Sequence, residues 1–303
     1  MSRQQRTQID AVLRRPQPES PRSVEELRGG FETLMARMLV PDGIRTSHVT
    51  LGERPALRVE PESGARAAGT ILYFHGGGWV FGSPRTALAL TGQLVAHTGF
   101  PAYSVDYRLA PEHPFPAAIH DALGAYRALL DHGEDPAGIA FAGDSAGGGL
   151  AVTTCLAARD AGLPMPAAIV MFSPGLDATR SGASMDTKED ADPIFTREAL
   201  EHTAAMYLDG ADAHQPLLSP AILADLTGFP PMLIQVGTNE VLLDDSTRLA
   251  VRAREAGVDV ILDVTAEVPH VFQAFRGVLE EADEALERAA LFLTQRIRAI
   301  GEC

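Results

Sequence analysis

The distribution of apolar and polar positions changes character near residue 71. Beyond it, short apolar runs alternate with longer stretches in which apolar residues recur at helical spacing. The short runs predict buried strands at Ile71–Phe74, Ala102–Tyr107, Ile139–Gly143, Ala168–Phe172, Met232–Val236 and Val260–Val264. The longer stretches predict helices at Ala87–His97, Pro116–Asp131, Ala146–Ala161, Ser246–Ala256 and Glu281–Ile300. Because apolar strands joined by helices are typical of parallel sheets, the pattern predicts an α/β fold with a mostly parallel central sheet and helices on both faces.

Two stretches depart from this alternation. Residues 1 to about 45 contain two helix-like segments, Thr7–Arg14 and Ser23–Met38, ahead of any predicted strand. Residues from about 177 to 217 form a polar, turn-rich loop followed by the amphipathic segment Thr196–Tyr207. Both could be surface decoration, but an insertion after the carboxyl end of a parallel strand lies over the ligand crevice. We therefore expect one domain, residues 1–303, in which these two stretches form a helical cap.

Composition narrows the class of protein. The chain has 303 residues, of which 46% are hydrophobic, enough for one large core. Its net charge of −15 argues against a nucleic-acid partner, which would require a basic face. No apolar run reaches the ~18–20 residues of a membrane span, and the polar start lacks the apolar segment of a signal peptide. The cysteines, Cys155 and Cys303, have no disulfide-framework spacing, which fits the cytoplasm, and Cys155 is expected to be buried.

A serine stands between two glycines where a predicted strand passes into a helix. The segment is Gly143-Asp144-Ser145-Ala146-Gly147, the G-x-S-x-G pattern of a nucleophile elbow in the strand–turn–helix context it requires. Such a turn strains the serine backbone and tolerates only small flanking residues, which leaves Oγ accessible to a base. The pattern predicts Ser145 as a nucleophile, with Asp144 bracing the turn.

A glycine run follows the first predicted strand. His75-Gly76-Gly77-Gly78-Trp79 has the HGGG arrangement whose backbone N–H groups form an oxyanion hole. By itself the run could be a flexible turn, but it accompanies an elbow in the expected chain order. We assign the Gly77, Gly78 and Ala146 N–H groups as oxyanion donors. Trp79 and Phe81 are candidate walls of the substrate pocket, and a plain core role is the alternative for either.

The base is sought among nine histidines, most of which have a structural explanation. His270 differs because it lies in a loop between the last predicted strand and the final helix, where the chain order serine, acid, histidine places the base. Glu240, close to the end of strand Met232–Val236, is the candidate acid, while Asp244 and Asp245 could instead be caps or dipole partners of the next helix. A metal site is rejected because no ligand spacing surrounds these motifs, and no cofactor is expected.

These motifs resemble the hormone-sensitive-lipase family of α/β-hydrolase esterases, also called bacterial family IV carboxylesterases. The resemblance covers roughly residues 40 to 300, and a third motif carries it, the segment from Asp106 to Ala117, which reads Asp-Tyr-Arg-Leu-Ala-Pro-Glu-His-Pro-Phe-Pro-Ala. It implies that this segment braces the loops behind the oxyanion hole and that the cap covers the site. The family's Asp-Pro-Leu-x-Asp pattern falls on Glu240-Val241-Leu242-Leu243-Asp244, which favours Glu240 as the acid although the residue type departs from the family's aspartate. A homodimer through the edge strand near Val260–Val264 is also implied.

The resulting hypothesis is a serine carboxylesterase with a Ser145–His270–Glu240 triad that hydrolyses short-to-medium acyl esters, lactones being a further possibility. An arylformamidase-like amide hydrolase is the alternative enzyme, because related sequences share both glycine motifs. A non-catalytic binding protein is the alternative of another class, since plant gibberellin receptors resemble this family but lack the catalytic histidine. His270 stands in its expected loop and argues against that alternative.

Overall fold

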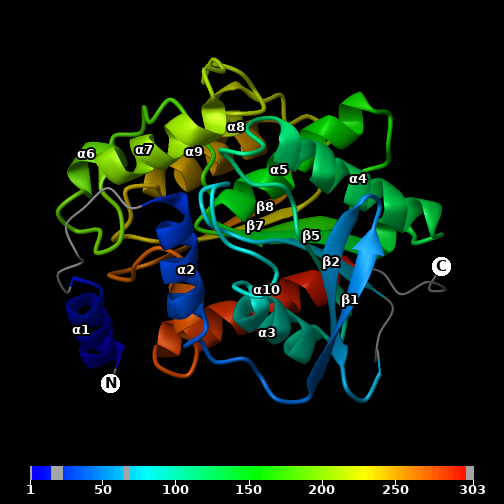
Figure 1. Ribbon diagram of the computed structural model, residues 1–303, viewed down its shortest axis with the longest axis horizontal. Coiled ribbons are helices and arrows are strands. Elements are labelled where there is room, and N and C mark those ends of the chain that lie inside the picture. Colours follow the sequence, from blue (N-terminus) through cyan, green and yellow to red (C-terminus); the bar gives the residue numbers. More distant parts are fainter. Residues whose placement is uncertain (1, 15–22, 65–68, 298–303) are drawn as a thin grey trace.

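An eight-stranded sheet crosses the computed structural model, which describes residues 2–14, 23–64 and 69–297 (Figure 1). The strand order is β1-β2-β4-β3-β5-β6-β7-β8. Strands β3 to β8 run parallel to one another, whereas the pairs β1–β2 and β2–β4 are antiparallel. Their bounds are β1 Ile44–Leu51, β2 Arg54–Pro61, β3 Thr70–Phe74, β4 Ala102–Val105, β5 Ile139–Asp144, β6 Ala168–Phe172, β7 Met232–Gly237 and β8 Val260–Thr265.

Helices cover both faces of the sheet. On one face α3 (Leu88–Thr98) packs against α10 (Glu280–Arg296); on the other lie α4 (Ala117–Asp131), α5 (Ala146–Asp160) and α9 (Leu243–Glu255) (Figure 1). The remaining α-helices are α1 Ser2–Leu13, α2 Val24–Met35, α6 Ser184–Thr187, α7 Arg197–Leu208 and α8 Pro220–Leu223. The short 3-10 helices are η1 Pro136–Gly138 and η2 Phe272–Phe275. The predicted α/β class, with a mostly parallel sheet covered on both faces, is confirmed.

The predicted strands and helices all appear, with ends shifted by a few residues. The largest difference at a start is in α1, which begins at Ser2 rather than Thr7, followed by α9, which begins at Leu243 rather than Ser246. The predicted end of the last helix, at Ile300, lies outside the described residues, as does Cys303. Strands β1 and β2 were not predicted from the sequence. The reason is local: β1 reads Ile-Arg-Thr-Ser-His-Val-Thr-Leu and lies at the sheet edge with most of its residues exposed, so it carries no apolar run.

Strand β8 forms the opposite edge of the sheet. Its Ile261 and Val264 side chains are 49% and 43% exposed. Dimerisation through this strand stays a prediction.

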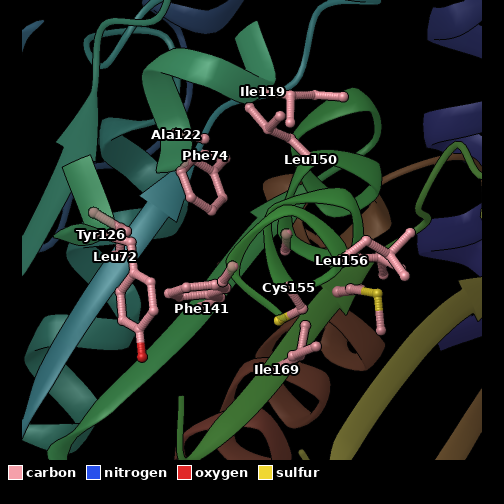
Figure 2. Close-up of a cluster of buried hydrophobic side chains, with 14 of the residues drawn as sticks. Leu72, Phe74, Ile119, Ala122, Tyr126, Phe141, Leu150, Cys155, Leu156 and Ile169 are labelled. Carbon is pink, nitrogen blue, oxygen red and sulfur yellow. The ribbon is translucent and has the colours of Figure 1, made fainter. Parts of the chain in front are cut away.

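The core between the sheet and helices α4 and α5 lies directly beneath the end of β5 (Figure 2). Leu72, Phe74 and Phe141 point from the sheet toward Tyr126 of α4 and Leu150 of α5, and the ring centroids of Tyr126 and Phe141 are 4.8 Å apart. Cys155 is fully buried in this cluster, as predicted. This packed core fixes where β5 ends and α5 begins, and therefore where the turn between them lies.

Replacing Leu72 by alanine tests this packing. We expect Leu72→Ala to lower the free energy of unfolding by about 2–5 kcal/mol, because the side chain is fully buried and its loss leaves a cavity. Leu291→Ala is the control: Leu291 is 57% exposed on α10, so its loss should change stability by less than about 0.5 kcal/mol. Urea unfolding followed by circular dichroism measures both, and equal effects would contradict the packing described here.

Candidate active site

Ser145 occupies the sharp turn between β5 and α5. Its backbone has φ 52° and ψ −119°, a region that non-glycine residues rarely adopt. A Cβ on Gly143 would come within 2.4 Å of the Gly147 oxygen, and a Cβ on Gly147 within 2.0 Å of the Phe74 oxygen. The two glycines therefore let β3, β5 and α5 approach closely enough to close the turn. Ser145 N–H donates to the Phe172 oxygen at 2.8 Å, which ties the turn to β6 as well.

Asp144 links the elbow to the glycine loop. Its buried carboxylate accepts a hydrogen bond from the Tyr73 hydroxyl at 2.8 Å and one from the Gly76 backbone. A Cβ on Gly76 would lie 2.2 Å from Asp144 Oδ2, so this position requires glycine. Burial raises the pKa of Asp144 to about 6, although its hydrogen bonds with Tyr73 and Gly76 work in the opposite direction. The carboxylate thus holds two loops together across the sheet.

The glycine loop after β3 presents its backbone toward the elbow. Gly77 and Gly78 have φ values of 121° and 59°, and a Cβ on Gly77 would come within 2.0 Å of the Phe81 oxygen. Val80 and Phe81 N–H groups both donate to the Gly77 oxygen at 3.0 Å, which closes the loop. In the described part of the chain, the N–H groups of Gly77, Gly78 and Ala146 donate to no protein acceptor. Ala146 is also the first residue of α5, where the helix dipole is positive.

The segment from Asp106 to Ala117 supports this loop from behind. The Tyr107 ring stacks on His75 with centroids 4.1 Å apart, and its hydroxyl donates to the His75 oxygen at 2.7 Å. Burial lowers the pKa of His75 to about 4, so this histidine is neutral near pH 7. Arg28 of α2 pairs with Glu112 at 2.7 Å and donates to the backbone oxygens of Val80 and Ala110. The segment and α2 therefore hold both ends of the turn that follows Trp79.

His270 and Glu240 are brought together by two loops at the same end of the sheet. Glu240 follows β7 and His270 follows β8, and His270 Nδ1 lies 2.8 Å from Glu240 Oε2, with both side chains almost fully buried. Burial lowers the pKa of His270, but the hydrogen bond and charge of Glu240 outweigh it, so the net shift is upward. Nε2 of the same ring has no partner among the described residues. The charge of Asp144, the residue before Ser145, also contributes to the raised pKa of His270.

The other candidate acids point elsewhere. Asp244 Oδ2 accepts from the Ser184 N–H at 3.0 Å, and Asp245 Oδ2 accepts from the N–H groups of Leu176 and Asp177 at 2.7 and 2.9 Å. Both lie in the first turn of α9, whose N-cap is Leu242, so they are not caps but are placed to interact with the helix dipole. Burial raises the pKa of Asp245 to about 7. Of the three carboxylates, Glu240 is the one in contact with His270.

A serine that was not predicted from the sequence joins the acid to the histidine loop. Ser173 Oγ donates to Glu240 Oε1 at 2.7 Å and accepts from the Val271 N–H at 3.0 Å. It is fully buried and has φ 48°, so it adopts a strained conformation at the end of β6. Gly237 N–H is a second donor to Glu240 Oε1, at 2.5 Å. The one local signal for Ser173 is its position directly after a predicted strand.

The insertion after β6 also reaches the site. Phe195 packs edge-on against the His270 ring with centroids 4.8 Å apart. The carboxylate of Asp192 accepts from the N–H groups of Phe195 and Val241, at 2.9 Å each, and so ties the insertion to the loop that carries Glu240. Trp79 stacks on Tyr207 of α7 at 4.6 Å, and Phe81 contacts Phe31 of α2 at 4.9 Å.

Helix α1 packs against the loop that carries His270. Its Ile9 packs with Val268 of this loop, and Arg6 pairs with Glu267 of the loop and with Glu281 of α10. The described residues contain no group of three or more histidine, cysteine or acidic side chains arranged to hold a metal ion. No described helix has the length and apolar character needed to cross a membrane. A cytoplasmic location stays a prediction.

Comparison with known proteins adds to this geometry. Residues 71–274 match a family described by the alpha/beta hydrolase fold. An acetyl-hydrolase from Streptomyces hygroscopicus is 44% identical over 246 residues, 81% of each chain. A crystal structure of an esterase from the bacterial hormone-sensitive lipase family has a TM-score of 0.93 at 40% identity, covering 97% of this chain and 99% of that one. The crystal structure of EstE5 soaked with p-nitrophenyl butyrate has a TM-score of 0.91 at 39% identity, covering 96% and 98%.

Glu240→Gln tests the electrostatics of the buried pair. We expect it to lower the pKa of His270, because the charge and hydrogen bond that raise this pKa are weakened while burial, which lowers it, remains. An NMR titration of the histidine rings measures the shift. The control is Asp244→Asn, whose side chain contacts Ser184 and not His270, and which should leave the titration unchanged. A larger shift in the control than in Glu240→Gln would contradict the pairing.

Proposed function

The chain belongs to the α/β-hydrolase family, within the hormone-sensitive-lipase group of esterases, and is a carboxylic-ester hydrolase; we propose that it acts through a Ser145–His270–Glu240 triad and an acyl-enzyme. The observation that carries this proposal is the buried contact of 2.8 Å between His270 Nδ1 and Glu240 Oε2. It fixes the tautomer with a proton on Nδ1, which leaves the lone pair of Nε2 free to accept a proton.

The proposed reaction has two stages, acylation of Ser145 and hydrolysis of the acyl-enzyme. His270 Nε2 takes the proton of Ser145 Oγ as the oxygen attacks the ester carbonyl carbon. The negative charge that develops on the carbonyl oxygen is stabilised by the N–H groups of Gly77, Gly78 and Ala146, each worth about 3–4 kcal/mol in comparable sites. The tetrahedral intermediate collapses, His270 gives its proton to the leaving alcohol, and the acyl group remains on Ser145. A water molecule then repeats both steps and releases the acid.

We propose short-to-medium acyl esters as substrates, with lactones as the cyclic form of the same bond. Two similar proteins support a short acyl group: one is named an acetyl-hydrolase, and the other was soaked with a butyrate ester. An arylformamidase-like amide hydrolase is the alternative, because it would use the same nucleophile and oxyanion donors. Comparing p-nitrophenyl esters, lactones and N-formyl aromatic amines as substrates separates these classes.

We also propose that α2 and the insertion from about residue 177 to 217 act as a cap. Phe31 of α2 contacts Phe81, Tyr207 of α7 stacks on Trp79, and Phe195 contacts His270. These contacts support a cover made of aromatic side chains on both sides of the glycine loop. Such a cover would exclude water from the developing oxyanion and would strengthen its hydrogen bonds. The same contacts support Trp79 and Phe81 as pocket walls.

Ser145→Ala tests the mechanism. We expect the rate with p-nitrophenyl butyrate to fall by about a millionfold in kcat, because the nucleophile is absent and only binding and the oxyanion donors remain. Ser47→Ala, at an exposed position of β1, is the control and should retain full activity. Turnover in Ser145→Ala comparable to that of the unaltered protein would exclude the serine mechanism.

Ser173→Ala tests a positioning role for its hydroxyl. We expect kcat to fall by about 10–100-fold with KM nearly constant, because Glu240 Oε1 and the Val271 N–H each lose a buried hydrogen bond. Ser104→Ala is the matched control, since Ser104 is equally buried but its Oγ has no partner in the described residues. Steady-state kinetics across pH measure the effect, and a parallel decrease in both variants would show a general packing defect instead.

A further inference from the structure

A narrow pocket lies beside the elbow, on the side of Trp79. Its walls include Gly149 and Gly175, whose N–H groups donate to the Ser145 carbonyl oxygen at 3.1 and 3.0 Å. Trp79 and Tyr207 form an aromatic wall, and Arg180 completes the lining. The free interior measures about 20 Å³, whereas one water needs roughly 10–15 Å³. The interior is therefore narrow, about the size of one or two water molecules.

Arg180 is an unusual residue for such a place. Its Nε is inaccessible to solvent and has no hydrogen-bond partner among the described residues. The guanidinium reaches the Asp177 backbone oxygen through a long contact of 3.4 Å from Nη1. Burial lowers the pKa of Arg180, and the charges of Asp245, Asp177 and Glu201 offset part of this effect while that of Arg197 adds to it. A buried donor of this kind is costly unless it meets an acceptor.

The neighbouring carboxylates are engaged with other donors. Asp177 Oδ2 pairs with Arg248 at 3.0 Å, and its two oxygens also accept from Thr179 and Ser181. Asp245 Oδ2 accepts from two backbone N–H groups. Arg180 itself is held with φ 54°, a conformation fixed by the turn that closes around Asp177. The guanidinium is thus kept in place without being neutralised by direct contact.

The position of the pocket favours the acyl part of an ester over its alcohol part as the occupant. The leaving alcohol must be close to His270 Nε2, since this atom gives it a proton. His270 and Phe195, which contacts it, are absent from the residues that line the pocket. The pocket instead adjoins Trp79, the residue that follows the oxyanion glycine Gly78. An acyl chain held by the oxyanion donors can therefore extend toward Arg180.

We propose that Arg180 makes this pocket selective for acyl groups that carry an oxygen acceptor, an oxo group or a carboxylate, a few carbons beyond the ester carbonyl. The proposal rests on the proposed function and adds to it the chemistry of the acyl group. The Arg180 guanidinium donates to that oxygen, while Trp79 and Tyr207 contact the carbons between the ester and the acceptor. The step is one of binding, and the ester chemistry is unchanged.

Two pairs of esters test it. The first pair is p-nitrophenyl 4-oxopentanoate and p-nitrophenyl pentanoate, and the second is ethyl hydrogen glutarate and ethyl pentanoate. For each pair, kcat/KM of the oxygenated ester is divided by kcat/KM of the plain ester. This ratio is then divided by the same ratio for hydroxide-catalysed hydrolysis, which corrects for the intrinsic reactivity of the esters. We expect at least one ratio to be about tenfold in favour of the oxygenated acyl group, and to fall to about one in Arg180→Met. The first pair reports a neutral acceptor and the second a carboxylate, so the pair that responds identifies the preferred group.

Arg288→Met is the control, because Arg288 of α10 pairs with Asp263 at 2.8 Å and lies outside the pocket lining. It should leave both ratios unaltered. Ratios near one for the unaltered protein would overturn the proposal, even if Arg180→Met did not fold, and would leave a water molecule as the partner of Nε. Ratios that persist in Arg180→Met would also overturn it. Failure of the proposed function is seen separately, as an absence of Ser145-dependent turnover of p-nitrophenyl acetate.

Discussion

The strained turn at Ser145 is the constraint on which the rest of the site depends. A serine held at φ 52° is stable only where its surroundings fix it, and here they do so from three strands. β3 approaches through Gly147, β5 supplies the turn, and β6 accepts the Ser145 N–H at Phe172. Each neighbouring element then carries one component of the site: the glycine loop follows β3, and Ser173 follows β6. The parallel sheet thus brings together, at the carboxyl ends of its strands, site residues that are far apart in the sequence.

Burial sets the charge state of the groups around this turn. His75 is buried and made neutral, whereas His270 is equally buried but is kept easy to protonate by Glu240. The difference lies in the partner: His75 Nδ1 faces the Gly76 oxygen and a tyrosine ring, while His270 faces a carboxylate. One histidine is therefore a structural support and the other has the properties of a base. Chain order in the sequence pointed to His270 as the base, and the physical cause of its difference from His75 is electrostatic.

The sequence predicted those features that depend on short-range constraints. The elbow and the glycine loop were recognisable because their glycines are required by close backbone approach, which leaves a local pattern. The choice between Glu240 and Asp244 was harder, since four residues separate them and both follow β7; only the folded loop shows that Asp244 turns toward Ser184. Ser173 and Phe195 escaped prediction because their partners are distant in the chain, and Arg180 because most of the other residues that line its pocket are distant from it in the chain. Strand β1 escaped because a solvated edge strand needs no apolar run.

The contact of Ser173 with Glu240 limits how this site can change over generations. Shortening the glutamate to an aspartate would withdraw the carboxylate by one carbon–carbon bond, about 1.5 Å. Two donors, the Ser173 hydroxyl and the Gly237 N–H, would then lose their acceptor inside the protein. Exchange between the two acids is therefore not a single substitution in this chain but a joint one, in which residue 173 changes together with residue 240. In a lineage that had acquired Glu240, the presence of Ser173 would therefore disfavour a return to aspartate.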